Sequence, residues 1–232
     1  MPSIDSKPVF KDYPIIMLVE KTNDQKTMRH IIEMTEQIKE AVCETAKNTC
    51  EANVKFAIYT FSDTSTFFHP NELKLISEFE LNSAFNEQIV DLSPVLLQLN
   101  NDLSRKTLLN NPIGYMLPMI ILVLAGDKKY VYGNSIDKVR ENMWFKRSRK
   151  AVFLMNENDT TSEIGINFTG TSEAVIKVYD IENAVDYFKE LICFSSIMGS
   201  MLAPRSLSSG DDIVSVDPIE DNFDWDDEWD EW

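Results

Sequence analysis

The chain has 232 residues, 44% of them hydrophobic, and a net charge of −16 at pH 7. This length is sufficient for one domain with a substantial core. Residues 211–232 hold eleven acidic and no basic residues, so the rest of the chain has a net charge of only −5. Without a basic excess, binding to nucleic acid or to an anionic membrane surface is not expected.

The sequence contains few signals that indicate a cellular compartment. Residues 1–12 lack the cationic start and apolar run of a signal peptide, and the apolar stretch 191–202 is too short to span a membrane. The three cysteines, Cys43, Cys50 and Cys193, are odd in number and fall in segments with a helical pattern. This favours reduced packing residues over disulfides or metal ligands, so we expect a cytoplasmic protein.

Buried strands are predicted where apolar residues run continuously, since such runs suit strands covered on both faces. These runs are residues 14–19, 54–61, 119–124 and 151–155, and a further strand is predicted at 174–179.

Helical patterns lie between these strands. Apolar residues at spacings of three and four predict a helix over about residues 25–48. Ser93 as N-cap and Pro94 at the first helical position predict a second helix. A third is predicted from about 136 to 145, and a last amphipathic helix carries Val185 and Phe188.

Alternating strands and helices of this length predict right-handed crossovers. The expected fold class is therefore α/β: a doubly wound, mainly parallel, Rossmann-like sheet with helices on both faces, followed by a disordered acidic C-terminal tail. We expect an N-terminal extension over 1–12, a domain over 13–203, and a linker with the acidic tail over 204–232. The chain contains neither a GxGxxG nor a GxxxxGK[ST] sequence, which argues against dinucleotide or P-loop phosphate binding.

Five segments in this order resemble conserved segments of one family. They are PIIMLVEKTND (14–24), VKFAIYTFSDTSTFFHP (54–70), LSPVLLQL (92–99), PMIILVLAGD (118–127) and KAVFLMNEND (150–159). Together they resemble the von Willebrand factor A (vWA) family, most closely the bacterial vWA proteins of the tellurite-resistance type. The resemblance covers roughly residues 12–200.

The vWA resemblance implies a Mg²⁺ site, the metal-ion-dependent adhesion site, where the strands end. The family's D-x-S-x-S motif falls on Glu20, Thr22 and Asp24, its threonine on Ser93, and its T-D-G aspartate on Gly126, one residue before Asp127. The ligand pattern is therefore altered at nearly every position. Because Mg²⁺ requires near-octahedral oxygen ligands, we expect a vestigial site and no cofactor, with weak Mg²⁺ binding as the alternative.

No catalytic arrangement is evident. The two histidines, His30 and His69, have no spacing that suggests a metal pair or a triad, and we expect both at the surface. We therefore do not expect an enzyme.

Three of the four tryptophans lie among the last eight residues, within the acidic run. A tail needed only for solubility gains nothing from exposed tryptophan, whereas tryptophan is frequent at binding hot spots. Trp225, Trp229 and Trp232 would line one side of a helix that folds on a partner. The candidate partner-binding residues are Phe223, Trp225, Asp226, Asp227, Glu228, Trp229, Asp230, Glu231 and Trp232.

Other roles for this tail remain open at the level of sequence. It could be purely solvating, dock on its own domain, or imitate a nucleic acid in a partner's basic groove.

The function expected is that of a non-enzymatic vWA-like adaptor that binds proteins through its strand-end loops and its acidic aromatic tail. The resemblance implies a protein kinase or a PP2C-type phosphatase of a stress-response module as partner. The alternative is a Mg²⁺-dependent protein-binding module.

Overall fold

The computed structural model describes residues 11–49, 52–62, 89–112 and 114–200. The chain divides into two units, Met1–Ser200 and Met201–Trp232, and every described element belongs to the first. The candidate tail residues 223–232 lie outside the described residues, as does His69.

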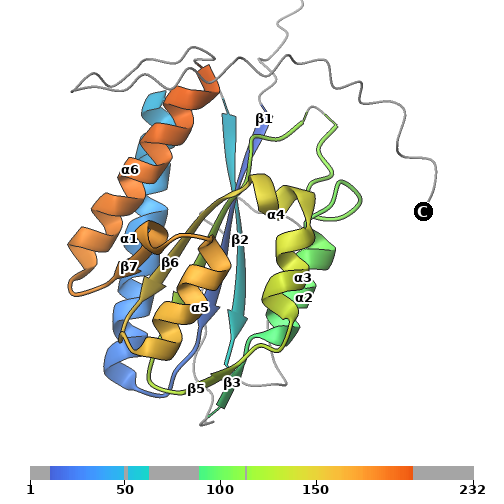
Figure 1. The fold of residues 1–232 in the computed structure, drawn as a ribbon. Coiled ribbons are helices and arrows are strands. Elements are labelled where there is room, and N and C mark those ends of the chain that lie inside the picture. Colours follow the sequence, from blue (N-terminus) through green and yellow to red (C-terminus); the bar gives the residue numbers. More distant parts are fainter. Residues whose placement is uncertain (1–10, 50–51, 63–88, 113, 201–232) are drawn as a thin grey trace, which may run out of the picture. The chain divides into compact units, whose positions relative to one another are not determined.

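A five-stranded parallel sheet forms the centre of the first unit, in the order β2-β1-β4-β6-β7 (Figure 1). Its strands are β1 (Lys11–Glu20), β2 (Ala52–Phe61), β4 (Met119–Leu124), β6 (Arg149–Leu154) and β7 (Val175–Lys177). The central strand β1 pairs with β2 on one side and with β4 on the other. Each predicted strand is present, although β7 is shorter than the predicted segment 174–179.

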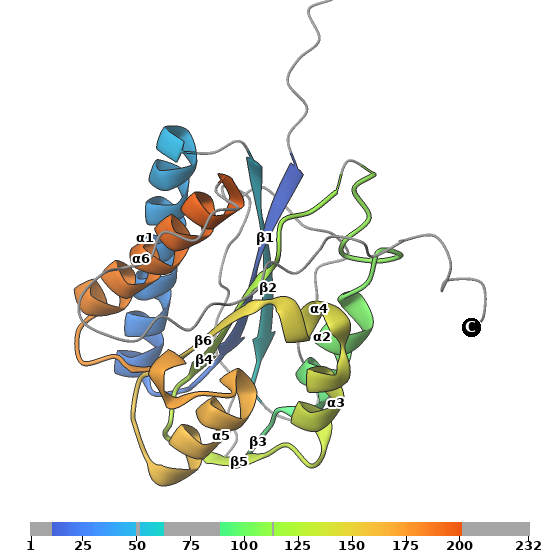
Figure 2. The same ribbon diagram turned by 45° about the horizontal axis from the view of Figure 1, so that its top comes forward.

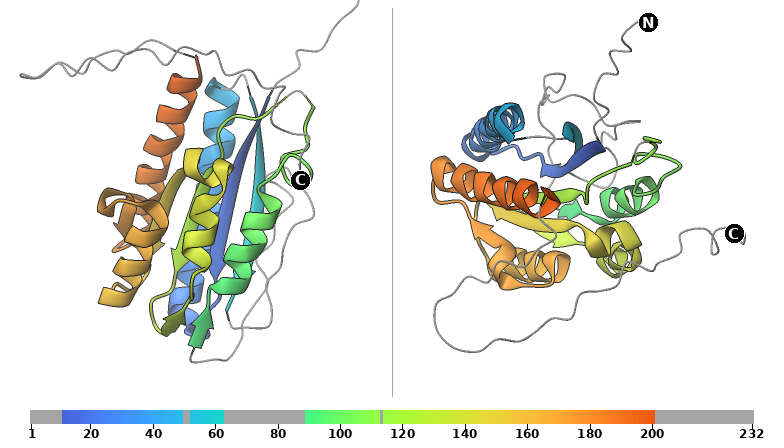
Figure 3. Two further views of the ribbon diagram at one scale, coloured as in Figure 1. Left: turned by 45° about the vertical axis from the view of Figure 1, so that its right-hand side comes forward. Right: turned by 90° about the horizontal axis from the view of Figure 1, so that it is seen from above.

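Helices cover both faces of this sheet, as the fold class requires (Figure 3). On one face lie α1 (Gln25–Thr49) and α6 (Ile181–Ser200), which pack on each other. On the other face lie α2 (Ser93–Asp102), α3 (Ser135–Glu141), α4 (Met143–Arg147) and α5 (Asp159–Thr169). Within the described residues, no helix is both long and apolar enough to cross a membrane.

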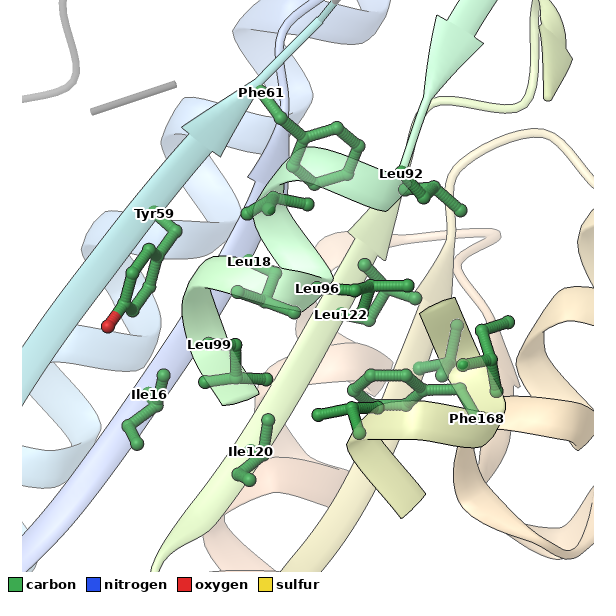
Figure 4. Close-up of a cluster of buried hydrophobic side chains, with 14 of the residues drawn as sticks. Ile16, Leu18, Tyr59, Phe61, Leu92, Leu96, Leu99, Ile120, Leu122 and Phe168 are labelled. Carbon is green, nitrogen blue, oxygen red and sulfur yellow. The ribbon is translucent and has the colours of Figure 1, made fainter. Parts of the chain in front are cut away.

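Two hydrophobic cores follow from this layering, one on each face of the sheet. Neighbouring residues of β1 point into different cores: Met17 packs with α1 and α6, and Leu18 packs with α2 and α5. Figure 4 shows the second core, where Leu96 and Leu99 of α2 lie over Leu18 and Leu122. Burial on both faces explains why these strands are continuously apolar instead of alternating.

A second, two-stranded parallel sheet lies at the end toward which the main strands point (Figures 1 and 2). It pairs β3 (Ile89–Asp91) with β5 (Lys129–Val131). Val90 and Tyr130, its central residues, are buried, while their neighbours are partly or fully exposed. Neither strand was predicted, because each has three residues of which only the central one is buried.

The single helix predicted over 136–145 was wrong, because the structure has two short helices there. Asn142 separates α3 from α4, and its side chain accepts the N–H groups of Trp144 and Phe145 as the N-cap of α4. Its amide nitrogen donates to the carbonyls of Asn100 and Leu103. Asn142 therefore links the start of α4 to the end of α2.

The predicted capping role of Ser93 was also wrong. Leu92 is the N-cap of α2, without a side-chain cap hydrogen bond, and Ser93 is the first helical residue. The Ser93 N–H donates to Asp91 Oδ1 at 2.8 Å, so the aspartate satisfies a donor at this helix start.

Helix α5 was missing from the prediction, although its boundaries carry sequence signals. Asn158 and Thr161 form a reciprocal capping box, and Gly170 ends the helix in the left-handed conformation at φ 86°. An Asn three residues before Thr and a Gly after an apolar periodic segment would have located it.

Candidate functional site

The candidate site lies at the carboxyl ends of β1 and β4. The chain leaves β1 toward β2 on one side, whereas β4 lies on the other side, so this point is a topological switch. Ligands of open α/β sheets bind in the crevice formed at such a point. Glu20 ends β1, and Ala125, Gly126 and Asp127 follow β4. The fold therefore brings three sequence-predicted positions, Glu20, Gly126 and Asp127, to the same edge of the sheet.

Glu20 is fully buried and directed into the protein. Its Oε2 accepts the N–H of Ala125 and the hydroxyl of Tyr130, each at 2.6 Å. The Tyr130 oxygen in turn accepts the N–H of Gly126 at 2.7 Å. Two successive backbone amides after β4 are thus satisfied, one by the carboxylate and one by the phenol.

Burial has the largest effect on the pKa of the Glu20 carboxyl group. Desolvation raises the pKa of Glu20 from 4.5 to about 7, against the hydrogen bonds from Tyr130 and Ala125, which lower it. Glu20 Oε1 and the hydroxyl of Ser62, which follows β2, are buried and have no hydrogen-bond partner among the residues described. Both are positioned at the same edge of the sheet, since Glu20 is paired in register with Phe61.

A hydrogen bond joins Thr22, two residues after Glu20, to Asp127. The Thr22 hydroxyl donates to Asp127 Oδ2 at 2.6 Å and accepts the N–H of Asp24 at 3.2 Å. Asp24 Oδ2 accepts the N–H of Thr27 at 2.8 Å, in the first turn of α1. Hydrogen bonding to the side chain and then to the backbone of Thr27 lowers the pKa of Asp24. Thr22 is 1% exposed, while Asp24 and Asp127 are exposed.

Gly126 cannot carry the carboxylate that the vWA motif places there. Its φ is +81°, a conformation that L side chains rarely adopt, and an added Cβ would lie 1.8 Å from the carbonyl oxygen of Asn156. The next residue, Asp127, supplies the carboxylate that reaches Thr22.

Three residues of this site were missed at the level of sequence. Tyr130 reaches Glu20 from β5, which the sequence did not predict. Asn156 and Asn158, after β6, donate to the carbonyls of Ala125 and Gly126 at 2.8 and 3.0 Å. Polar residues directly after a buried strand were the available signal, in the segment NEND at 156–159.

Other candidate residues are placed elsewhere. Ser93 is linked to Asp91, not to the Thr22–Asp127 pair. His30 is exposed on α1, as predicted. The tail residues Phe223, Trp225, Asp226, Asp227, Glu228, Trp229, Asp230, Glu231 and Trp232 lie outside the described residues.

The six positions that the vWA resemblance assigns to a Mg²⁺ site do not form an octahedral set of oxygens in this arrangement. Glu20 Oε2 and Asp24 Oδ2 already accept protein N–H or O–H groups, and Gly126 contributes no side chain. In the part of the chain that the structure describes, no group of three or more His, Cys, Asp or Glu residues could hold a metal ion. Among these positions, the one buried carboxylate oxygen that the described residues leave open is Glu20 Oε1, so the site as it stands falls short of the near-octahedral oxygen set that Mg²⁺ requires.

An exposed surface surrounds this network, and we name it the strand-end surface. It includes two exposed apolar side chains of the small sheet, Ile89 at 47% and Val131 at 39%. Its polar members are Asp24, Asp127, Glu157, Asn158 and Asp159, all exposed. The same region carries Lys26, Lys128 and Lys129, and Glu157 forms an ion pair with Lys177 at 2.7 Å, so this surface presents both charges together with a few apolar side chains, a composition found at protein interfaces.

No family model matches the chain, and no curated protein matches it. Solved structures do match the chain. Proximal thread matrix protein 1 (PTMP1) from the mussel byssus is 12% identical with a TM-score of 0.54, over 79% of this chain and 48% of that one. The pilus adhesin SpaC from Lactobacillus rhamnosus GG is 9% identical with a TM-score of 0.50, over 80% and 30%. Both are vWA-domain proteins.

The chain has a vWA-like fold. At these identities the likeness concerns the fold alone, and the chain spans about half the length of PTMP1 and less than a third of SpaC. Another PTMP1 structure, also with a TM-score of 0.54, has a zinc-occupied MIDAS motif. The predicted parallel vWA-like sheet with helices on both faces is therefore confirmed.

Proposed function

We propose that this chain is a non-enzymatic, vWA-like adaptor that binds partner proteins through the strand-end surface and through the acidic aromatic segment 211–232. The observation that carries the proposal is the Thr22–Asp127 hydrogen bond at the topological switch point. It holds an exposed carboxylate in one position at the carboxyl edge of the sheet. Preorganised groups of this kind reduce the entropy lost when a partner binds.

The burial of the most perturbed acid supports a binding role over a catalytic one. Glu20 is 0% exposed, so a substrate could not reach it without rearrangement of the site. The exposed groups near it, Asp24 and Asp127, are engaged in hydrogen bonds of loop structure. Polar groups that support loops are what a recognition surface needs.

Affinity purification from the native cell, with mass spectrometry of the bound proteins, tests this proposal. We expect Asp127→Ala to reduce capture of specific partners at least tenfold. Asp137→Ala, which removes an exposed acid on α3, is the matched control and should capture them normally. Equal capture by both variants would exclude the strand-end surface as the binding site.

The acidic segment is tested separately by a chain that ends at Leu207. If partners are lost with the segment, single replacements of Trp225, Trp229 and Trp232 by alanine should each weaken binding, by about 2 kcal/mol for a hot-spot residue. If the same partners remain, the segment is not the docking element.

For the identity of the partner, we propose a basic protein surface, and more narrowly a protein kinase or a PP2C-type phosphatase of a cytoplasmic stress-response module. The eleven acids of 211–232, a segment that holds no basic residue, support a basic partner. The kinase or phosphatase rests on the sequence resemblance to tellurite-resistance-type proteins. Its absence among captured partners would contradict that narrower proposal.

A Mg²⁺-dependent module is the second candidate, and one observation favours it: Glu20 Oε1 is buried without a hydrogen-bond partner among the described residues. A saturable rise in melting temperature with Mg²⁺ that Asp24→Ala abolishes would support this candidate.

A further inference from the structure

We infer that the Tyr130 hydroxyl takes the place of a divalent cation as the partner of Glu20, so that the strand-end site is assembled without metal. The inference concerns the site of the proposed function, but its test requires no partner protein. It rests on the geometry of Tyr130, on its attachment to the fold, and on the engagement of the other candidate ligands.

Tyr130 links the acid that ends β1 to the turn that follows β4. It donates to Glu20 Oε2 at 2.6 Å and accepts the Gly126 N–H at 2.7 Å, while Ala125 donates to the same Glu20 oxygen at 2.6 Å. A phenol can both donate and accept, so a single group bonds one oxygen of the acid and also the turn after β4. A metal ion could satisfy the acid but would repel the Gly126 N–H.

The fold holds Tyr130 in this position from two sides. Tyr130 is the central residue of β5, which is paired with β3, and the Leu92 N–H donates to the Val131 carbonyl at 2.8 Å. Its side chain is only 5% exposed and belongs to the core on the α2 side of the sheet. Displacement of the hydroxyl by an ion would therefore require β5 to move.

The other candidate ligands are committed to the same metal-independent arrangement. The Thr22 hydroxyl donates a hydrogen bond to Asp127, and Asp24 accepts one from the Thr27 N–H. Position 126 has no room for a side chain, because an added Cβ would lie 1.8 Å from the Asn156 carbonyl oxygen.

The test compares Tyr130→Phe with Tyr132→Phe in the full chain. Tyr132 is a partly exposed neighbour, and no hydrogen bond of its hydroxyl is seen among the described residues, so Tyr132→Phe is the matched control. Melting temperatures are measured with EDTA and with millimolar MgCl₂ or MnCl₂, and Mn²⁺ binding by calorimetry.

For the wild type and Tyr132→Phe we expect the same melting temperature with EDTA and with either cation. For Tyr130→Phe we expect a melting temperature lower by about 3–8 °C, from the loss of a buried hydrogen bond. Part of this loss should be restored by a divalent cation, which can then occupy the position beside Glu20.

Two results would overturn the inference. One is a cation response of the wild type that equals the response of Tyr130→Phe. The other is a destabilised Tyr130→Phe without any cation response, which would make Tyr130 a structural hydrogen bond only. If Tyr130→Phe does not fold, Mn²⁺ calorimetry of the wild type decides: saturable heat that Glu20→Gln abolishes overturns the inference, and its absence supports it.

Discussion

Gly126 shows how one residue limits the chemistry of the strand-end site. With φ at +81° and the Asn156 carbonyl oxygen 1.8 Å from an added Cβ, any side chain requires the turn to move. We expect Gly126→Ala to lower the free energy of unfolding by at least about 2 kcal/mol, as measured by urea denaturation.

Gly133→Ala is the control for this substitution. Gly133 also has a positive φ, +49°, but an added Cβ would meet nothing within 4 Å. Its cost should be only the backbone strain, about 1 kcal/mol. Similar losses in both variants would mean that the close approach to Asn156 does not constrain the turn.

Glu20 should make stability depend on pH. Its folded-state pKa of about 7 lies above the unfolded value of 4.5, because burial disfavours the charged form. Between these values the unfolded chain releases a proton that the folded chain retains, so stability falls as pH rises. The stabilising contribution is complete below about pH 4.5 and is lost above about pH 7, and a shift of this size corresponds to about 3 kcal/mol.

Glu20→Gln should remove this dependence, since glutamine remains neutral and its oxygen can still accept from Ala125 and Tyr130. As the pH rises from 5 to 8, the wild type should lose about 2–3 kcal/mol of unfolding free energy relative to Glu20→Gln. Other carboxyl groups cancel in this difference. A constant difference across this range would show that Glu20 titrates near its ordinary pKa.

At the scale of elements, Asn142 connects α4 to the end of α2. Its oxygen caps α4, and its nitrogen donates to the Asn100 and Leu103 carbonyls at 3.1 and 3.3 Å. Asn142→Ala removes the cap and leaves these carbonyls without their donor. We expect a loss of about 1–3 kcal/mol in unfolding free energy, measured by chemical denaturation.

Asn134→Ala provides the comparison for Asn142→Ala. Asn134 holds the corresponding N-cap position of α3, but its side chain makes no cap hydrogen bond. Its replacement should change stability by no more than about 0.5 kcal/mol. Equal effects at both positions would contradict the role of Asn142 as the joint between helices.

At the scale of the whole first unit, the two cores share one sheet and should unfold together. Met17 and Leu18 are adjacent in β1, are both 0% exposed, and pack on opposite faces. We expect Met17→Ala and Leu18→Ala each to cost about 2–5 kcal/mol and to shift the same single transition. Ile166→Ala, at a side chain that is 42% exposed, should have little effect.

Calorimetry and circular dichroism should report coincident transitions for Met17→Ala and Leu18→Ala. A second transition that only one of the two variants moves would indicate that the faces unfold independently.

Long periodic elements of this chain were predictable because their burial is visible in local composition. The continuous apolar runs of β1, β2, β4 and β6 indicated burial on both faces, and the helical period over about 25–48 indicated α1. The strands β3 and β5 and the break between α3 and α4 were not predictable. β3 and β5 have three residues each, and the break at Asn142 depends on contacts with a helix forty residues earlier in the chain.

The same division applies to the candidate site. The sequence by itself determined the strand ends that meet there, since Glu20 ends one buried strand, Thr22 and Asp127 follow buried strands, and parallel strands share a carboxyl edge. Only the tertiary structure decided how they are used. Tyr130 reaches Glu20 over 110 positions of sequence, and the carbonyl of Asn156 excludes a side chain at Gly126. Contacts between residues so distant in sequence leave no periodic or spacing signal, because the fold alone brings them together.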